Sequence, residues 1–368
     1  MREITAEFGG FGGRLWFNTA HQGPLPAAAV AAARVAAELK AAPHRLADTD
    51  FAEVPERLRT TLARLVGGAP EEIVLGNSTS YGMHAVANGL TFAPDDEVLV
   101  IAGDYPATVL PWQRVTKVRA VPADELADAI GPRTRVVAVT WVDSFTGRAL
   151  DLATLKAACA DAGALLVVNG SQAVGARSVD LSTVDVLVSC GYKWLCGPYG
   201  TGFAWIRPEV LMKLKPRQAY WLAMHAGRGL DVMRDTTLRT DLGVRAFDVF
   251  CPADFGNTLP WLASLDLLLD IGIDAIAEHD QHLVDRFVSG LDRDRYRLVS
   301  PAAGPTRSTL VVLSAVDGDT AARHHVLTEA GVDTAFREGN LRLSMHLFNT
   351  PAQVDRVLEL LHDNQTRP

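Results

Sequence analysis

Cysteine is scarce in this sequence, which argues against two kinds of scaffold. Only Cys159, Cys190, Cys196 and Cys251 occur in 368 residues, and their positions show no metal-ligand clustering. Disulfide frameworks are typical of small secreted chains with many closely spaced cysteines. We therefore expect neither a metal centre nor a disulfide framework.

Charged residues are also few, at 21% of the chain, with a net charge of −8 and a pI of about 5.7. No long basic run is present, so a nucleic-acid or anionic-membrane partner is not expected. The first ten residues, MREITAEFGG, lack the basic and then apolar pattern of a signal peptide. No apolar run is long enough to span a bilayer. These absences predict a cytoplasmic protein that does not enter membranes.

Several common catalytic and nucleotide-binding motifs are missing as well. The chain has no G-x-G-x-x-G after a predicted strand, no P-loop, no H-E-x-x-H and no G-x-S-x-G. What the chain does have is hydrophobic content, at 48% of its residues. This is enough to build one large α/β domain and a smaller second one, each with a core.

The most informative stretch runs from residue 165 to residue 203. Two short apolar runs, 165–168 and 184–188, each end in glycine and polar residues, as expected for buried strands. Ligand groups in α/β sheets lie just beyond the carboxyl ends of the strands. Asn169, Gln172 and Lys193 follow these two runs and are therefore expected in one crevice.

Lys193 has unusual neighbours for a lysine. A loop lysine is ordinarily a surface residue, but this one lies among Gly, Tyr, Trp, Leu and Cys, with no adjacent acid. Apolar surroundings disfavour the ammonium form and lower the pKa of a lysine. A lysine of this kind can form a Schiff base with a carbonyl compound.

The stretch as a whole resembles a known family. The segments NGSQAVG and SCGYKWLCGPYGTGF are similar to the patterns D-G-[AS]-Q-x-x-G and [SG]-[SG]-H-K-[WLF]-x-x-G-P-x-G-x-G of class V aminotransferases, which are fold-type I pyridoxal phosphate (PLP) enzymes. The resemblance implies PLP as the cofactor and an amino acid as the substrate. Lys193 would form the Schiff base and then carry the proton at Cα, and Gln172 would contact the phenolic oxygen of PLP. It also implies a homodimer with the active site at the interface.

The resemblance further implies a fold-type I architecture. We expect an N-terminal arm (1–25) that reaches the active site, a large PLP-binding domain (26–274) with a mostly parallel mixed sheet, and a small C-terminal α+β domain (275–368). The strand at 203–206 should be antiparallel, and a helix should cover 261–271. Residues 213–250 carry few helix signals, and irregular loops of this length often bind substrate.

Further cofactor contacts follow from matching positions in the family patterns. Thr79 and Ser80 lie in a turn that opens a helix, where a phosphate is favourable, although an ordinary N-cap has the same sequence. The remaining expected contacts are Tyr105 stacked on the ring, Ser144 at the phenolic oxygen, Tyr192 next to the lysine, Cys190 at the phosphate, and Asn257 at the phosphate of the neighbouring subunit.

Three residues are expected to bind substrate. The segment GNLRLSMHLFNT at 339–350 resembles the family's G-x-[IVL]-R-[VIL]-S-x-H-x-[YF]-N-T, which places Arg342 on the substrate carboxylate. A guanidinium suits this role because it binds a carboxylate through two parallel hydrogen bonds. His21 and Gln22 of the N-terminal arm are the other candidates, and a purely structural role is the alternative for each of the three.

One departure from the family pattern bears on the reaction. Family members usually place a carboxylate beside the pyridine nitrogen, whereas this chain has Asn169. An amide cannot stabilise a protonated nitrogen by charge, so negative charge at Cα should be less stabilised. Cys190 and Tyr192 also replace a usual serine and histidine. Together these residues argue against a standard aminotransferase.

Three functions remain open on the sequence. The first is a C–S lyase acting by β-elimination on a cysteine-derived substrate, with decarboxylative oxidative deamination as a close variant. The second is an aminotransferase or epimerase, and the third is a non-catalytic protein with a PLP-enzyme fold. A persulfide-forming desulfurase is not expected, because the segment 332–341, VDTAFREGNL, contains no cysteine before Arg342.

Overall fold

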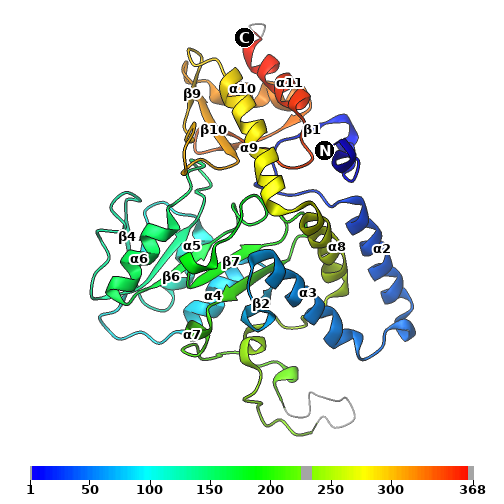
Figure 1. Ribbon diagram of the computed structural model, residues 1–368, viewed down its shortest axis with the longest axis vertical. Coiled ribbons are helices and arrows are strands. Elements are labelled where there is room, and N and C mark those ends of the chain that lie inside the picture. Colours follow the sequence, from blue (N-terminus) through cyan, green and yellow to red (C-terminus); the bar gives the residue numbers. More distant parts are fainter. Residues whose placement is uncertain (1, 225–233, 364–368) are drawn as a thin grey trace.

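The computed structural model describes residues 2–224 and 234–363 and is organised around a seven-stranded sheet (Figure 1). The strand order is β2-β8-β7-β6-β5-β3-β4, and β8 runs antiparallel to both of its neighbours, β2 and β7. The antiparallel strand predicted at 203–206 is thus confirmed. The strands are β2 (Ile73–Gly76), β3 (Glu97–Ile101), β4 (Lys117–Val121), β5 (Thr134–Thr140), β6 (Leu165–Asn169), β7 (Val186–Cys190) and β8 (Gly202–Ile206).

Helices cover both faces of this sheet, which explains why its central strands are apolar throughout. On β5, Val136 and Ala138 join one core cluster, whereas Val137 and Val139 join the other. The first cluster is closed by α4 (Thr79–Gly89) and α5 (Pro106–Gln113), and the second by α3 (Asp50–Val66), α6 (Leu152–Ala162) and α8 (Phe255–Ile271). Helix α2 (Ala27–Ala41) packs against α8, and the short α7 (Pro208–Leu211) follows β8.

A smaller α+β unit follows in the chain, as expected, and occupies the top of the view in Figure 1. Its antiparallel sheet has the order β12-β13-β10-β9 and encloses the third core cluster. Its elements are α9 (Ile273–Gly290), β9 (Tyr296–Leu298), β10 (Leu310–Ala315), α10 (Thr320–Glu329), β11 (Val332–Asp333), β12 (Ala335–Arg337), β13 (Asn340–Ser344) and α11 (Pro351–His362).

The N-terminal segment contacts this smaller unit as well as the site. After α1 (Arg2–Thr5), the strand β1 (Leu15–Trp16) pairs in parallel with β11. Phe17 is fully buried in the core of the smaller unit, and Asn18 forms a bridge with Ser344. The first residues of the chain are therefore held by the C-terminal part of the molecule.

Two predicted segments differ in detail from the structure. The helix expected at 261–271 begins earlier, at Phe255, because the Asp254 side chain accepts a hydrogen bond from the Asn257 amide and caps its first turn. Within 213–250, 3₁₀ turns occur at Trp221–Ala223 and Gly243–Phe247, and residues 225–233, with His225 and Arg228, lie outside the described part. In the described ranges, no helix is both long and apolar enough to cross a membrane.

Candidate active site

The candidate site forms where β6 and β7 end. These neighbouring strands are parallel, so Asn169 at the end of β6 and Cys190 at the end of β7 lie at the same edge of the sheet. Lys193 follows three residues later and is only 7% exposed. Burial lowers the pKa of the Lys193 amine, Arg342 lowers it further, and Cys190 opposes the shift. The amine is therefore more nucleophilic near neutral pH than that of a surface lysine.

The loop that carries Lys193, residues 192–196, is fixed through its carbonyl groups. The Tyr192 carbonyl accepts from the Gly23 amide (2.9 Å), and the Lys193 carbonyl accepts from the Cys196 amide (3.1 Å). The Trp194 carbonyl lies 3.0 Å from His346 Nε2, and the Cys196 carbonyl accepts from Ser264 Oγ (2.8 Å). Besides the Cys196 amide within the loop, donors from three other parts of the chain thus set the position of the loop.

Gly23 leaves no room for a side chain beside this loop. A Cβ on Gly23 would lie 1.9 Å from the Lys193 carbonyl oxygen, so Gly23→Ala must displace one of the two segments. A displacement of about 1 Å can cost about 10²-fold in rate, and we expect a loss of turnover of that order in steady-state assays. Gly10→Ala is the matched control, because a Cβ on Gly10 would have no neighbour within 4 Å and the φ of this residue is −73°. Equal activity of the two variants would contradict this account of the loop.

Gln172 joins the N-terminal segment to the lysine loop. Its Nε2 donates to the Ala20 carbonyl (3.0 Å) and approaches Ser144 Oγ at 3.5 Å. Its Oε1 accepts from Trp194 Nε1 (2.9 Å). The structure thus brings together Gln172 and Ser144, the two residues expected at the phenolic oxygen, and fixes the Gln172 amide from both ends.

Asn169 is the first member of a buried hydrogen-bond chain. Its Nδ2 donates to Thr108 Oγ1 (2.9 Å), its Oδ1 accepts from the Ser171 amide (3.0 Å), and Thr108 Oγ1 lies 2.8 Å from Thr140 Oγ1. The Asp104 carboxylate accepts from the Thr140 amide (2.9 Å) and from its hydroxyl, and burial raises the pKa of this carboxyl. These hydrogen bonds orient the Asn169 amide so that its second Nδ2–H can donate to a ligand.

The expected phosphate end lies at the start of α4. Ser78 caps this helix by accepting from the Tyr81 amide (3.1 Å), Thr79 is buried with its Oγ1 2.5 Å from Ser171 Oγ, and Ser80 is exposed. A Cβ on Gly202 would lie 2.8 Å from the Ser78 backbone, so glycine permits this close approach. The free amides of a helix N-terminus favour an anion here.

Of three other predicted cofactor residues, two lie near Lys193 and the third does not. The Tyr105 ring centroid is 5.5 Å from Lys193 Nζ. Tyr192 packs against Tyr199, with ring centroids 4.6 Å apart, and its hydroxyl contacts Cys190. Asn257 lies in the first turn of α8, where its Nδ2 donates to Asp254 (2.9 Å), so it does not join the cluster around Lys193 in this chain.

Arg342 lies on β13 with its guanidinium in the crevice. Its Nη1 donates to the Ser144 carbonyl (3.0 Å), and its buried Nε has no partner among the described residues. Burial and the nearby Arg337 lower the pKa of Arg342 to about 10. Nε and Nη2 share one edge of the guanidinium, so this edge is oriented for a carboxylate that binds through both nitrogens.

His21 of the N-terminal segment faces the same space. Burial lowers the pKa of His21, and the charges of Arg337, Arg342 and Lys193 lower it further. The Gln22 carbonyl accepts from Trp16 Nε1 (2.9 Å), a contact within the N-terminal segment. No carboxylate in the described ranges is ion-paired with Lys193 or Arg342, so the crevice suits an anionic ligand.

The hairpin before Arg342 is short. Strands β12 and β13 are joined by Glu338 and Gly339, with φ values of +49° and +77°, which is the geometry of a tight two-residue turn. Arg337, the last residue of β12, lies close enough to His21 and Arg342 to shift their pKa values. Sequence reasoning missed Arg337, Thr108, Thr140 and Asp104, although Asp104 and Thr108 lie next to the predicted Tyr105 in the sequence.

The residues fit PLP on the structure alone. A buried lysine amine without an acidic partner, an unpaired guanidinium Nε and a helix N-terminus converge on the crevice. They match an aldehyde, a carboxylate and a phosphate respectively. No cluster of three or more His, Cys, Asp or Glu side chains suited to a metal occurs in residues 2–224 and 234–363.

Comparison with known proteins agrees with this geometry. The class V aminotransferase family model matches residues 24–220. Isopenicillin N epimerase of Streptomyces clavuligerus is 30% identical over 94% of this chain and 93% of its own length, and a probable cysteine desulfurase of Methanothermobacter thermautotrophicus is 27% identical over 84% and 83%.

A solved complex of a cystine C–S lyase with cysteine persulfide superposes with a TM-score of 0.85, at 22% identity, over 96% of this chain and 99% of the other. The apo cysteine desulfurase of Thermococcus onnurineus gives a TM-score of 0.84 at 20% identity, over 98% and 96% of the two chains. These likenesses confirm the predicted fold. The chain therefore belongs to the class V aminotransferase family of PLP-dependent enzymes.

Proposed function

We propose that this protein is a PLP-dependent C–S lyase that cleaves a cysteine-derived amino acid by β-elimination. Asn169 carries the proposal, because its amide is held by Thr108 and Ser171 where family members usually have a carboxylate. PLP, when bound, supplies an electron-accepting ring that stabilises negative charge at the Cα of an amino acid. An uncharged partner beside the ring nitrogen weakens that stabilisation. β-Elimination is affected least, because the negative charge at Cα is removed as soon as the β-substituent leaves.

The residues of the crevice divide the work between cofactor and substrate. Lys193 would hold the aldehyde of PLP, and Tyr105, Gln172, Ser144 and Asn169 would contact its ring. The phosphate would be held by Thr79, Ser80 and Cys190, with Tyr192 beside Cys190. Asn257 is assigned to the phosphate of a second subunit, which makes a homodimer part of the proposal.

Substrate is oriented between Arg342 and Lys193. The free edge of Arg342 would bind the α-carboxylate, His21 borders the same space, and the neighbouring Gln22 is kept as a second candidate. Lys193 Nζ would take the proton from Cα, which the lowered pKa of its amine favours. The Cβ–S bond would break with the electron pair leaving on sulfur, and the proton held on Lys193 would go to that sulfur to give the thiol. Hydrolysis of the remaining three-carbon fragment by water would give pyruvate and ammonia.

The tight β12–β13 hairpin supports elimination over persulfide formation on the enzyme. A desulfurase that carries sulfur on its own chain needs a cysteine able to reach the substrate, and neither the turn at Glu338–Gly339 nor the flanking strands contain one. Sulfur released in this crevice would therefore leave as the thiol product, and would not be carried as a persulfide on a cysteine of the hairpin. The fold shared with a cystine C–S lyase is compatible with this route.

Epimerisation is the second candidate, and the 30% identity to isopenicillin N epimerase favours it. Both reactions begin with removal of the Cα proton by a lysine, and they differ in what happens next. An epimerase returns a proton to Cα, whereas a lyase expels a β-substituent. A substrate with a β-thioether therefore separates the two candidates.

Asn169→Asp tests the role assigned to the amide. If the amide suits elimination, the aspartate variant should keep β-elimination as its main reaction, with a rate within about tenfold of the unmodified protein, or about 1.4 kcal/mol in barrier height. The Thr108 hydroxyl can still hydrogen-bond to residue 169 in this variant, because it can rotate to donate to the aspartate carboxylate. Elimination of an S-alkyl-cysteine and amino transfer to a keto acid are measured side by side.

Asn88→Asp, an exposed amide on α4, is the matched control and should change neither rate. An increase in amino transfer of about 10²-fold or more in Asn169→Asp would overturn the lyase proposal. Such a result would show that the protein is an aminotransferase limited by its own Asn169.

A further inference from the structure

A fully buried pair of side chains lies behind the lysine loop. Asp280 comes from α9, and His346 follows β13, and both side chains have 0% exposure. His346 Nδ1 is 2.9 Å from Asp280 Oδ2, and His346 Nε2 is 3.0 Å from the Trp194 carbonyl oxygen. The imidazole therefore connects the smaller unit to the residue next to Lys193.

The chemistry of the two contacts requires a proton on Nε2. The Trp194 carbonyl can only accept, so Nε2–H must donate to it. At Nδ1, one proton is shared with the Asp280 carboxylate, and this arrangement persists as a neutral pair or as an ion pair. Although burial lowers the pKa of His346, Asp280 outweighs it and raises this pKa to about 10.

We propose that His346, held by Asp280, is a positioning residue for Lys193. The His346 ring meets the Trp194 ring edge to face, with centroids 5.2 Å apart and an interplanar angle of 82°. Trp194 in turn donates from Nε1 to Gln172 (2.9 Å). One imidazole thus fixes both the backbone and the ring of Trp194, and through them Lys193 and Gln172.

The position of His346 in the chain gives this contact a second consequence. His346 follows Arg342 by four residues, and of the four donors to the lysine-loop carbonyls it alone comes from the C-terminal segment. The contact therefore sets the distance between the guanidinium assigned to the substrate carboxylate and the amine that acts at Cα. This inference rests on the proposed role of Lys193.

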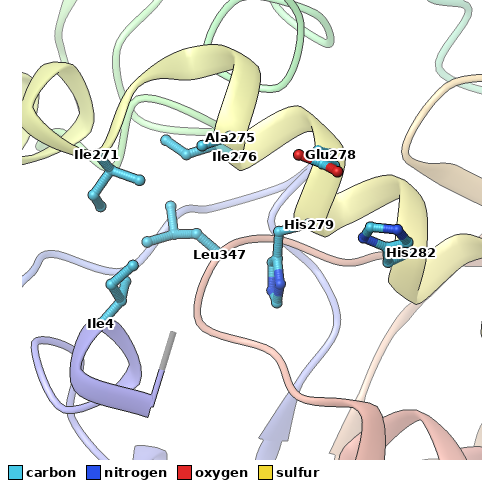
Figure 2. A pocket seen from close by; sticks show the side chains of 8 residues that line it. All are labelled: Ile4, Ile271, Ala275, Ile276, Glu278, His279, His282 and Leu347. Carbon is cyan, nitrogen blue, oxygen red and sulfur yellow. The ribbon is translucent and has the colours of Figure 1, made fainter.

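The outer side of α9 provides a control. His279 and His282 line a largely apolar hollow together with Ile4, Ile276 and Leu347 (Figure 2). Asp280, on the same helix, is instead buried against His346. His279 Nε2 also lies 3.1 Å from the Asn349 carbonyl. His282 is exposed, so His282→Gln changes the same helix without touching the lysine loop.

The test removes the pair without leaving an unpaired charge. In Asp280→Leu/His346→Phe, two apolar side chains replace the buried pair, an exchange that often leaves stability unchanged. PLP is added to the full-length, cofactor-free chain, and the adduct is trapped with borohydride and located by peptide mass spectrometry. We expect labelling of Lys193 to be about 10- to 100-fold slower than in the unmodified chain, with a matching loss in kcat and little change in KM.

Asp280→Asn is the conservative variant, because its amide can donate to Nδ1 while Nε2–H still donates to Trp194. It should label near the unmodified rate, as should His282→Gln. If Asp280→Leu/His346→Phe does not fold, His346→Gln replaces it in the test. The glutamine amide can contact only one of the two partners, Asp280 or the Trp194 carbonyl. Labelling of Lys193 in this variant should therefore be about tenfold slower.

The outcomes separate this inference from the proposed function. Unchanged labelling in the double variant, or in His346→Gln where that variant decides, overturns the positioning role and leaves the proposed function standing. Absence of any label on Lys193 in the unmodified chain overturns the proposed function and this inference together. Slow labelling of Lys193 only in the variants that lose the contact between His346 and Trp194 supports both the positioning role and the proposed function.

Discussion

Lys193→Ala should reduce turnover by about 10²–10⁴-fold from the loss of proton transfer alone. The structure gives the reason, because the Lys193 amine is buried at the carboxyl edge of the sheet and this burial lowers its pKa. Turnover of an S-alkyl-cysteine is measured with PLP in excess. Lys215→Ala, an exposed lysine beyond α7, is the matched control and should keep full activity.

The pH dependence of labelling provides a second check on Lys193. Burial disfavours the ammonium form, so the neutral amine is reached at a lower pH than for an exposed lysine. The rate of PLP attachment to Lys193 should therefore rise with pH and level off at a pH below the ordinary pKa of a lysine amine. A Lys193→Ala variant with full turnover, or a Lys193 profile that levels off only at that ordinary pKa, would contradict the assigned role.

Arg342→Lys should have the second largest effect, despite conserving the charge. A lysine cannot donate to the Ser144 carbonyl and also present two parallel N–H groups to a carboxylate. Loss of a charged hydrogen bond costs about 1.5–3 kcal/mol, so kcat/KM should fall about 10- to 100-fold, mainly through KM. Steady-state kinetics with the amino acid substrate measure this change.

An amine that lacks the α-carboxylate provides the internal control for Arg342. This amine should react more slowly than the amino acid, but at the same rate in the unmodified protein and in Arg342→Lys. The reason is that the amine lacks the carboxylate that Arg342 binds. Arg297→Lys, on the exposed side of β9, should leave both substrates unaffected. Equal losses for substrates with and without the carboxylate would indicate that Arg342 acts on the fold instead.

Local patterns in the sequence predicted the centre of this molecule well. The apolar runs that lead to Asn169 and Cys190 are parallel neighbouring strands, and their existence follows from short-range signals, in which buried strands end in polar turns. The antiparallel direction of β8, which the family resemblance implied, is also found. The residues that follow each strand reach one edge of the sheet because the topology allows no other placement.

The surroundings of Asn169 could not be predicted in the same way. Thr108 lies 61 residues before Asn169 in the chain, and Thr140 lies 32 residues after Thr108. Their hydroxyl groups meet only because α5 packs against β5, and nothing in the local sequence distinguishes them from other threonines. The same holds for His346 and Trp194, which are 152 residues apart.

Identification of products by mass spectrometry tests the proposed reaction most directly. The PLP-loaded protein is mixed with an S-alkyl-cysteine and no keto acid. We predict catalytic release of pyruvate and a thiol, with many turnovers per subunit. Release of an aldehyde and carbon dioxide, inversion at Cα without bond cleavage, or a single conversion of the cofactor that resumes only when a keto acid is added would each contradict β-elimination.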